Sequence, residues 1–386
     1  MKKKIAFLTF ALARGGTEKV VSILLQELCK DFTVYLILTS RIIEYPVPAN
    51  VQIHFIDNST ENENLFIRLL KIPLLSYRYY TFCKIKDIDI SISFLNRPNY
   101  IACMMRFFRW KKKIIISERT STLLQYSGNN LKSKTGKILV KWLYPKSDLI
   151  LTNSQANITD LKNHFAINTT LLSIYNPIDL KNILSKKEEK VKDVDFTKFT
   201  YIMLGRFVNE KDHGSLLEAF SMLPNKIDCQ LLLIGHGKNE HSIRLKAAEL
   251  KITPNVIFIA FTENPYKYLS KSHCFVLSSI QEGFPNVLIE ALSCSLPSIS
   301  TDCKNGPREL LAPQTDYSYQ LTDKMELAEF GILVPVKNSK VLSKAMQTIF
   351  NDKILYQKYK QQCIRRAECF DISTIIQEYQ NVFNKD

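Results

Sequence analysis

Two carboxylates and two cations are the residues of this sequence whose types and spacing could do chemistry. Glu282 and Glu290 stand eight positions apart, where an apolar run gives way to a helical pattern. Arg206 and Lys211 stand five positions apart, after another apolar run. Paired cations can neutralise a phosphate. Carboxylates beside a phosphate site are electrostatically unusual unless they bind something neutral and hydroxylated, such as a sugar.

The helix after Gly283 adds a second anion-binding feature. Its start holds Phe284, Pro285 and Asn286, with the proline expected in the first turn, where a missing N–H costs nothing. The free backbone amides of residues 284–286 are predicted to bind an anion, which Gly283 lets approach closely. The alternative is structural: one carboxylate caps the helix, the other is solvated, and the two cations are solvated loop charges.

Buried strands must position these residues. Residues 200–204 and 274–277 read as strands that end immediately before the two charged loops. Parallel strands place their carboxyl ends at one edge of a sheet, so the loops should converge there. Further strands are expected at 229–234 and 256–260, and helices at 213–223, 239–250, 353–369 and 372–384.

The first half of the chain shows the same alternation. Strands are expected at 4–10, 33–39, 51–55, 114–116 and 148–152. Residues 1–13 imitate a signal peptide, but a glycine pair and an amphipathic helix pattern follow at once, so a first strand is expected instead. The loop with Gly15, Gly16 and Glu18 is a weak phosphate-binding signal, because Gly-Gly is not GxGxxG.

The expected fold is therefore α/β, with two Rossmann-like, doubly wound domains that face a cleft. The first domain should cover residues 1–182 and the second residues 183–369, and the charged segment 182–198 reads as a linker. The C-terminal helix, 370–386, is expected to pack back on the first domain.

The totals restrict the function classes. A chain of 386 residues is long enough for two domains. The formal net charge of +15 predicts an anionic partner: nucleic acid, acidic lipid or a phosphorylated substrate. Nine cysteines without paired spacing favour a reducing compartment, and none has metal-site spacing. No apolar run reaches the roughly 18–20 residues that span a bilayer.

One segment suggests contact with a membrane surface. Residues 64–86 carry Leu70, Leu74, Tyr77, Thr81 and Ile85 at helical spacing, interleaved with basic residues. The basic residues that would contact lipid head groups or a lipid diphosphate are Arg68, Lys71 and Arg78. Residues 104–113 form a second basic, aromatic segment. The alternative is an ordinary solvated basic helix packed on the sheet.

Together, Gly-Arg-x4-Lys after a strand and Glu-Gly-Phe-x5-Glu at a helix start resemble the retaining nucleotide-sugar glycosyltransferases of family 4, with the GT-B fold. The resemblance covers the whole chain. Within that family, several segments resemble bacterial N-linked-glycosylation transferases that add N-acetylgalactosamine to an undecaprenyl-diphosphate glycan. These segments are residues 94–102, 143–151, 264–268 and 283–290.

The resemblance implies a role for each donor-site residue. Arg206 and Lys211 would neutralise the donor diphosphate, and Glu290 would accept both ribose hydroxyls. Glu282 would hold hydroxyls of the transferred sugar, without being assigned as a nucleophile. The donor site would also include Gly16, the helix start with Phe284, Pro285 and Asn286, and Phe261 near the base. No metal and no cofactor beyond the UDP-sugar substrate are implied.

On the acceptor side, the resemblance implies Gly15, Glu18, Glu118 and Arg119. Many relatives have a histidine where this chain has Arg119. A fixed cation cannot act as a base near neutral pH, so Arg119 is expected to bind acceptor or donor phosphate.

The predicted function is α-retaining transfer of N-acetylgalactosamine from a UDP-sugar to a polyisoprenyl-diphosphate oligosaccharide. The enzyme would act as a peripheral protein at the cytoplasmic face of the inner membrane. One alternative is another UDP-sugar transferase of capsule or O-antigen synthesis. The other is a non-catalytic anion-binding protein, although the carboxylate pair and the lack of a nucleic-acid-binding motif argue against that and against a nucleic-acid partner.

Overall fold

The structure is a computed structural model that describes residues 2–60, 62–224 and 226–385. The chain divides into two units. The first unit consists of Met1–Pro177 and Ile372–Asp386, and the second of Ile178–Asp371. Residue 182, the predicted domain boundary, lies inside a helix of the second unit, α7 (Leu180–Lys186).

The first unit is built on a seven-stranded parallel sheet in the order β3-β2-β1-β4-β5-β6-β7. The strands are β1 (Lys4–Thr9), β2 (Thr33–Leu38), β3 (Gln52–Phe55), β4 (Ile90–Phe94), β5 (Lys113–Glu118), β6 (Leu149–Thr152) and β7 (Leu171–Ser173). The helices are α1 (Gly16–Leu28), α2 (Leu65–Lys86), α3 (Asn96–Met104), α4 (Thr122–Gln125), α5 (Leu131–Leu143), α6 (Gln155–Phe165) and α15 (Ile372–Asn384), with short 3₁₀ helices η1 (Met105–Phe108) and η2 (Tyr144–Lys146).

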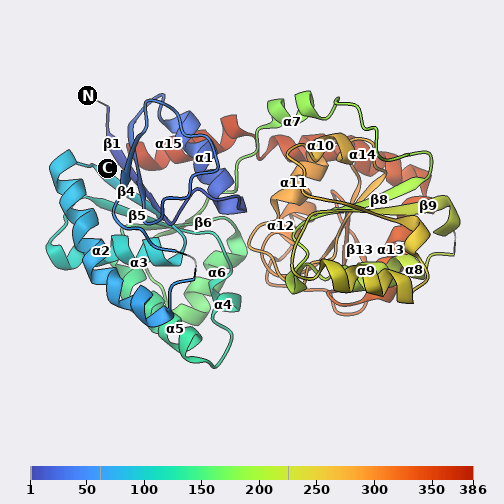
Figure 1. The fold of residues 1–386 in the computed structure, drawn as a ribbon, viewed down its shortest axis with the longest axis horizontal. Helices are drawn as coiled ribbons and strands as arrows, with labels where there is room; N and C mark the ends of the chain where they lie inside the picture. The colour runs from blue at the N-terminus through green and yellow to red at the C-terminus, as the bar shows by residue number, and fades with distance from the viewer. Residues whose placement is uncertain (1, 61, 225, 386) are drawn as a thin grey trace. The chain divides into compact units, whose positions relative to one another are not determined.

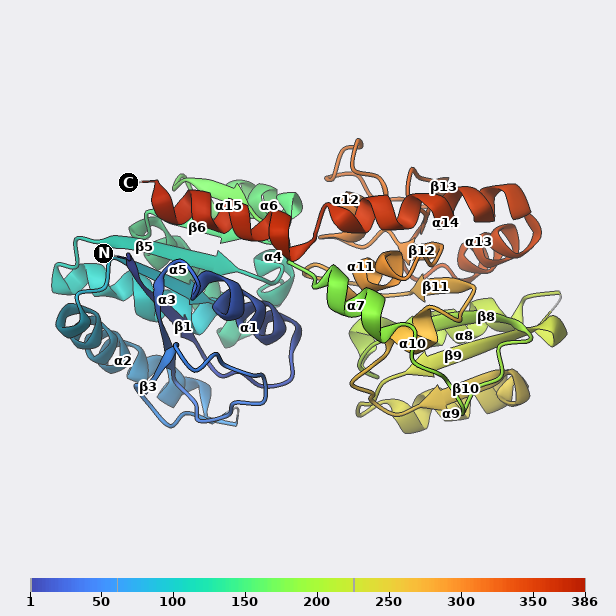
Figure 2. The same cartoon turned by 90° about the horizontal axis from the view of Figure 1, so that it is seen from above.

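Residue alternation along β1 divides the first unit into two hydrophobic cores. Ala6 and Leu8 face a core shared with α2, α3 and α5, whereas Ile5 and Phe7 face a core shared with α1 and α15. Figure 1 shows these two groups of helices on opposite faces of the sheet, and in Figure 2 α1 and α15 lie in front of it. The C-terminal helix is thus part of the first unit's core.

The second unit repeats the arrangement with the order β10-β9-β8-β11-β12-β14-β13, in which only the β13–β14 pair is antiparallel among the described residues. Its strands are β8 (Phe199–Leu204), β9 (Cys229–Ile234), β10 (Val256–Ile259), β11 (Cys274–Leu277), β12 (Ser298–Thr301), β13 (Glu326–Leu327) and β14 (Ile332–Val334). Besides α7, its helices are α8 (His213–Ser221), α9 (Glu240–Glu249), α10 (Tyr266–Leu269), α11 (Asn286–Ser293), α12 (Pro307–Leu311), α13 (Ser339–Asn351) and α14 (Lys353–Glu368), with 3₁₀ turns η3 (Asn209–Lys211), η4 (Lys226–Asp228) and η5 (Thr253–Asn255). Helices α8, α9 and α13 pack on one face of this sheet.

Two local expectations need correction. The segment 182–198 is not linker throughout, because α7 occupies its beginning; Asp179 caps that helix by accepting a hydrogen bond from the Asn182 amide. Pro285 lies at the cap position before α11 rather than in its first turn.

Candidate active site

In the second unit the strand order reverses at β8, which lies between β9 and β11. Open α/β sheets bind ligands beyond the carboxyl ends of the strands at such a switch point. The loops that leave β8 and β11 there are residues 205–212 and 278–285. They carry Arg206, Lys211 and Glu282, so the topology brings these three predicted donor residues to the same edge of the sheet.

An ion pair joins the two loops. Lys211 Nζ lies 2.5 Å from Glu282 Oε1, and the side chains are only 17% and 10% exposed. The same carboxylate oxygen accepts a hydrogen bond of 2.6 Å from Ser279 Oγ. Glu282 therefore has two close donors on one carboxylate oxygen, an arrangement that suits binding better than nucleophilic attack.

Two further hydrogen bonds fix the loops against each other. Ser278 Oγ donates to the Lys211 carbonyl at 2.9 Å, and the Ile280 amide donates to the Glu210 carbonyl at 2.9 Å. Ser278 and Ser279 were not identified as site residues from the sequence. Polar residues directly after a buried strand are the signal that could have indicated them.

Helix α11 begins at Asn286 and presents its first amides next to the β11 loop. The Leu288 amide bonds the Pro285 carbonyl at 3.0 Å. Glu290 lies on this helix with 6% of its surface exposed. Glu282 and Glu290 therefore belong to one continuous loop–helix segment, as predicted, whereas their proposed ligands stay a prediction.

The loop after β12 packs directly against this segment. Gly306 has φ +109°, and a Cβ there would lie 2.4 Å from Pro285 Cδ, so only glycine fits without a shift. Next to it, Asn305 is buried, and both polar atoms of its side chain have no hydrogen-bond partner among the described residues. The Asn305 side chain was not identified from the sequence.

Arg206 and Phe261 lie at the ends of neighbouring strands. Arg206 follows β8 and is exposed, and Phe261 follows β10 and is about half exposed. The ring of Phe261 contacts His236, which follows β9, at a centroid distance of 5.9 Å. His236 is a site candidate that the sequence analysis missed; its position between two glycines after a strand was the available signal.

In the first unit, the glycine loop precedes α1. Gly15 is the cap residue, and Gly16 is the first residue of the helix. A Cβ on Gly15 would lie 2.2 Å from a Glu18 carboxylate oxygen, so Glu18 folds back over the loop. The binding roles of these three residues stay predictions.

Glu118 and Arg119 are buried and have partners inside the first unit. Glu118 accepts a hydrogen bond of 2.6 Å from the Tyr144 hydroxyl, and complete burial raises the pKa of its carboxyl. The Arg119 guanidinium donates to Asn176 Oδ1 at 2.8 Å and to the hydroxyl of Tyr379 on α15. In this conformation Arg119 therefore holds the C-terminal helix, and a phosphate would have to displace those contacts to reach it.

The three cations predicted on α2 separate into two groups. Lys71 binds Glu63 at 2.6 Å and Asp57 at 3.1 Å, and Arg78 donates to the Ile56 carbonyl at 2.8 Å. These contacts tie both residues to the segment before α2. By contrast, no hydrogen bond or ion pair reaches the Arg68 guanidinium from any residue that the structure describes.

Over residues 2–60, 62–224 and 226–385, no group of three or more His, Cys, Asp or Glu side chains is arranged to hold a metal ion.

Comparison with known proteins identifies the family. The sequence model for "Glycosyl transferases group 1" matches residues 185–368. The chain is 38% identical, over 96% of its length and 96% of the relative's, to the N-acetylgalactosamine-N,N'-diacetylbacillosaminyl-diphospho-undecaprenol 4-alpha-N-acetylgalactosaminyltransferase of Campylobacter jejuni. The chain belongs to the group 1 glycosyltransferases.

Solved structures agree on the fold of this glycosyltransferase. Sucrose-phosphate synthase from Thermosynechococcus elongatus superposes with a TM-score of 0.79 at 16% identity, covering 99% of this chain and 98% of that one. The Anabaena protein HepE in complex with UDP gives 0.76 at 15% identity, covering 98% and 99%. The predicted GT-B class, with two Rossmann-like domains, is confirmed.

Proposed function

We propose that this glycosyltransferase moves N-acetylgalactosamine from UDP-N-acetylgalactosamine to an undecaprenyl-diphosphate-linked oligosaccharide, with retention and in α linkage. The main structural support is the junction of the β8 and β11 loops, where Lys211 and Glu282 form an ion pair of 2.5 Å beside the start of α11. The choice of sugar and acceptor is supported by the similarity to the Campylobacter jejuni transferase.

The junction provides what a nucleotide-sugar donor requires. The diphosphate would lie between Arg206, Lys211 and the first amides of α11, where its charge grows as the sugar–phosphate bond breaks. Glu290 would accept the ribose hydroxyls, and Phe261 would stack beside the base. Glu282 would accept hydroxyls of the transferred sugar. These cations would supply the electrostatic stabilisation that a metal ion gives elsewhere.

Because no nucleophile is assigned, the proposed retention requires attack on the same face of the sugar rather than a double displacement. Glu282 is held by Lys211 and Ser279, so it is a poor candidate for covalent attack on the sugar. We infer that the acceptor hydroxyl attacks from the side on which the phosphate departs. The departing phosphate oxygen then takes the proton of that hydroxyl.

We also propose that the first unit contacts the cytoplasmic face of an anionic inner membrane. The face of α2 that carries Leu70, Leu74 and Tyr77 points to solvent, with Leu70 64% exposed and Leu74 50% exposed. Exposed Trp142 on α5 continues this apolar surface, in ring contact with Phe107 of η1 at 5.3 Å. Exposed apolar side chains among lysines and arginines suit the boundary between lipid head groups and acyl chains.

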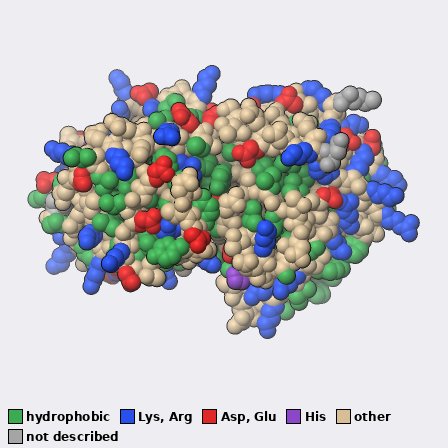
Figure 3. Space-filling model, turned by 180° about the vertical axis from the view of Figure 1, so that it is seen from behind, with side chains coloured by type: hydrophobic (Ala, Val, Ile, Leu, Met, Phe, Trp, Pro, Cys, Tyr) green, Lys and Arg blue, Asp and Glu red, His purple; other side chains and the backbone are tan. Residues whose placement is uncertain are grey.

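Charge on the rest of the molecule is compatible with that contact. Helix α5 carries four lysines and no acidic residue over Leu131–Leu143. On the face drawn in Figure 3, Lys and Arg side chains are more frequent than Asp and Glu, in keeping with the net charge of +15. None of the helices described is both long and apolar enough to cross a membrane.

The test is a donor screen with product analysis. The full chain is incubated with UDP-N-acetylgalactosamine, UDP-N-acetylglucosamine, UDP-galactose or UDP-glucose and a prenyl-diphosphate-linked acceptor that ends in N-acetylgalactosamine. We expect transfer from UDP-N-acetylgalactosamine, and NMR of the product should show an α anomer. A β product would refute retention, a different preferred donor would refute the sugar assignment, and no transfer from any donor would refute the proposed reaction.

A further inference from the structure

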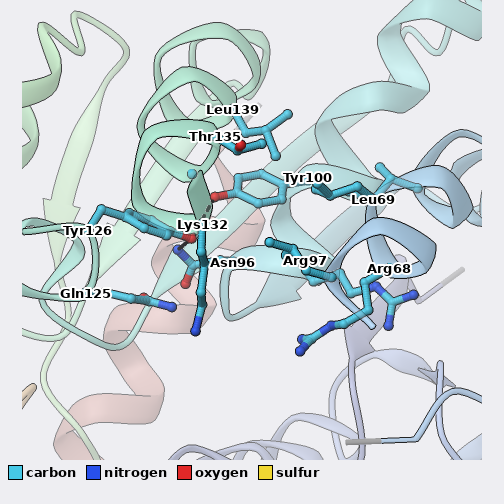
Figure 4. Close-up of a pocket in the computed structure, with 13 residues that line it drawn as sticks. Arg68, Leu69, Asn96, Arg97, Tyr100, Gln125, Tyr126, Lys132, Thr135 and Leu139 are labelled. Atoms are coloured by element: carbon cyan, nitrogen blue, oxygen red, sulfur yellow. Dashed lines mark hydrogen bonds between the residues drawn. The ribbon is translucent and has the colours of Figure 1, made fainter. Parts of the chain in front are cut away.

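A pocket lies within the first unit, between α2, α3 and the α4–α5 segment. Its volume is about 140 Å³. Whole-ligand pockets usually hold about 300–1,000 Å³, so this one suits a single chemical group rather than a nucleotide sugar. Figure 4 shows Arg68 and Arg97 next to one another on one side of the pocket and Lys132 across from them.

Arg97 is the residue that most clearly points to a ligand. It follows β4, next to the switch point of this sheet, and its side chain is only 9% exposed. Its Nη1 donates to Ser59 Oγ at 3.2 Å and lies 3.5 Å from the Glu63 carboxylate. Its Nε and Nη2 have no hydrogen-bond partner among the described residues. Buried guanidinium N–H groups without acceptors are unfavourable, so an acceptor from a ligand would complete them.

The charge of the lining points to an anion. Arg68, Arg97 and Lys132 line the pocket, and none of its lining residues is acidic. Among the described residues, Glu63 is the ion-pair partner of Arg97, but Glu63 and Asp57 are both also bound by Lys71. Burial lowers the pKa of Arg97; the Glu63 carboxylate opposes this shift, and the nearby positive charge of Arg68 adds to it. Cations held this close are stabilised when an anion lies between them.

The remaining walls are apolar and preformed. Leu65, Leu69, Ile72 and Leu139 contribute aliphatic surface to the lining. The Tyr126 ring closes the floor only because residue 136 is glycine: a Cβ there would lie 2.1 Å from the ring. The Tyr126 hydroxyl is bonded to Tyr100 at 3.0 Å, so its position is fixed.

We propose that this pocket binds a phosphate or diphosphate group that is attached to an apolar chain, with Arg97, Arg68 and Lys132 as its ligands. The inference rests on the proposed function, because the acceptor there is a prenyl diphosphate glycan. It differs from the sequence prediction in the residues that bind the anion: Lys71 and Arg78 are replaced by Arg97 and Lys132. The apolar walls would contact the first carbons of the chain.

The test is calorimetry on the full chain with UDP present at saturation, so that the donor site is occupied. The probes are farnesyl diphosphate, inorganic pyrophosphate and farnesol. We expect farnesyl diphosphate to bind more tightly than either of the other two. Lys132→Ala and Arg68→Ala, both at accessible positions, should each weaken it about tenfold or more, as expected for loss of a charge-assisted hydrogen bond.

Controls separate this proposal from the proposed function. Lys134→Ala removes the same charge from the same helix outside the pocket and should leave the affinity unchanged. Arg97→Lys should retain more affinity than Arg97→Met, and circular dichroism checks that both fold. If the native chain binds no UDP, the proposed function fails. If UDP binds normally but Lys132→Ala and Arg68→Ala match Lys134→Ala, the pocket proposal fails. Pyrophosphate binding as tight as farnesyl diphosphate would overturn the apolar part.

Discussion

The ion pair between Lys211 and Glu282 allows a test in which two neighbouring substitutions act in opposite directions. Lys211 is proposed to bind the donor diphosphate, yet without ligand its ammonium lies 2.5 Å from the Glu282 carboxylate. The diphosphate must therefore compete with that carboxylate for Lys211. Glu282→Gln removes the competing charge while preserving the size of the side chain and an oxygen that can accept a hydrogen bond.

The expected size of the effect follows from the contact. A hydrogen bond to a charged group contributes about 1.5–3 kcal/mol, and a neutral one about 0.5–1.5 kcal/mol. Releasing Lys211 from the stronger contact should therefore favour UDP binding by about 1–1.5 kcal/mol, a factor of about 5–12. Lys211→Ala should weaken UDP binding by about tenfold or more, because it removes a phosphate contact and leaves Glu282 unpaired. Turnover should fall in both variants, since Glu282 is also proposed to hold the sugar.

The assay is calorimetric titration of each variant with UDP, followed by rate measurements with the UDP-sugar. Glu240→Gln is the matched control: it removes a carboxylate from an exposed ion pair with Arg244 in the same unit, and it should change neither quantity. Weaker UDP binding by Glu282→Gln would show that the carboxylate does not compete with the diphosphate. Unchanged binding by both Lys211→Ala and Glu282→Gln would place the pair outside the nucleotide site.

Three further predictions concern other parts of the chain. Glu290→Ala should weaken UDP about 100-fold but 2′-deoxy-UDP much less, because its carboxylate is proposed to bind ribose hydroxyls; equal losses in calorimetry would remove that role. Leu70→Asp with Leu74→Asp should weaken binding to anionic vesicles about 30-fold, at about 1 kcal/mol for each half-exposed leucine. Ile354→Asp, a change at a still more exposed position on α14, should have no effect, and similar losses for both variants would refute the membrane surface. Burial lowers the pKa of His213 to about 4 in the folded chain. As pH falls from about 6.5 towards 4, this imidazole is therefore protonated in the unfolded chain but not in the folded one, and the free energy of unfolding decreases. His213→Leu should reduce the loss in unfolding free energy between pH 7.5 and 4.5 by about 2–3 kcal/mol in urea titrations; an unchanged loss would contradict the burial argument.

The donor loops could be predicted because each depends on a local pattern. An apolar run that ends in a charged loop identifies the carboxyl end of a strand, and parallel strands bring such ends together. The topology of the first sheet was harder to predict from the sequence. β4 was not predicted, because its inward Ser91 and Ser93 interrupt the apolar run; both hydroxyls are buried and bonded, to Tyr79 at 2.8 Å and Asn99 at 2.8 Å. Without β4, the switch point of the first sheet could not be located.

Contacts between residues far apart in the chain could not be predicted from local sequence patterns either. Arg119 was expected to bind phosphate, but its partner Tyr379 lies 260 positions away. For α2, helical spacing identified the face with Leu70 and Leu74 but could not say whether it meets the sheet or the solvent. The helix carries apolar residues on both sides, and it is the other side, with Ile72, Leu75 and Tyr79, that packs inward.

Equivalent strand order gives the two units an equivalent means of binding anions. The strand order reverses at β1 in the first sheet and at β8 in the second. The next strand across the reversal is β4 in the first sheet and β11 in the second. That neighbour is followed by residues 95–97, at the start of α3, in the first unit and by the loop residues 278–282 in the second. In the second unit Glu282 balances Lys211, so a ligand must compete for the cation and the site can be selective. In the first unit two N–H groups of Arg97 have no partner in the described part of the chain, so an anion would gain contacts there without displacing any. The arrangement in the second unit suits a donor diphosphate, which must be held and then released. The arrangement in the first unit suits an acceptor diphosphate, which does not react.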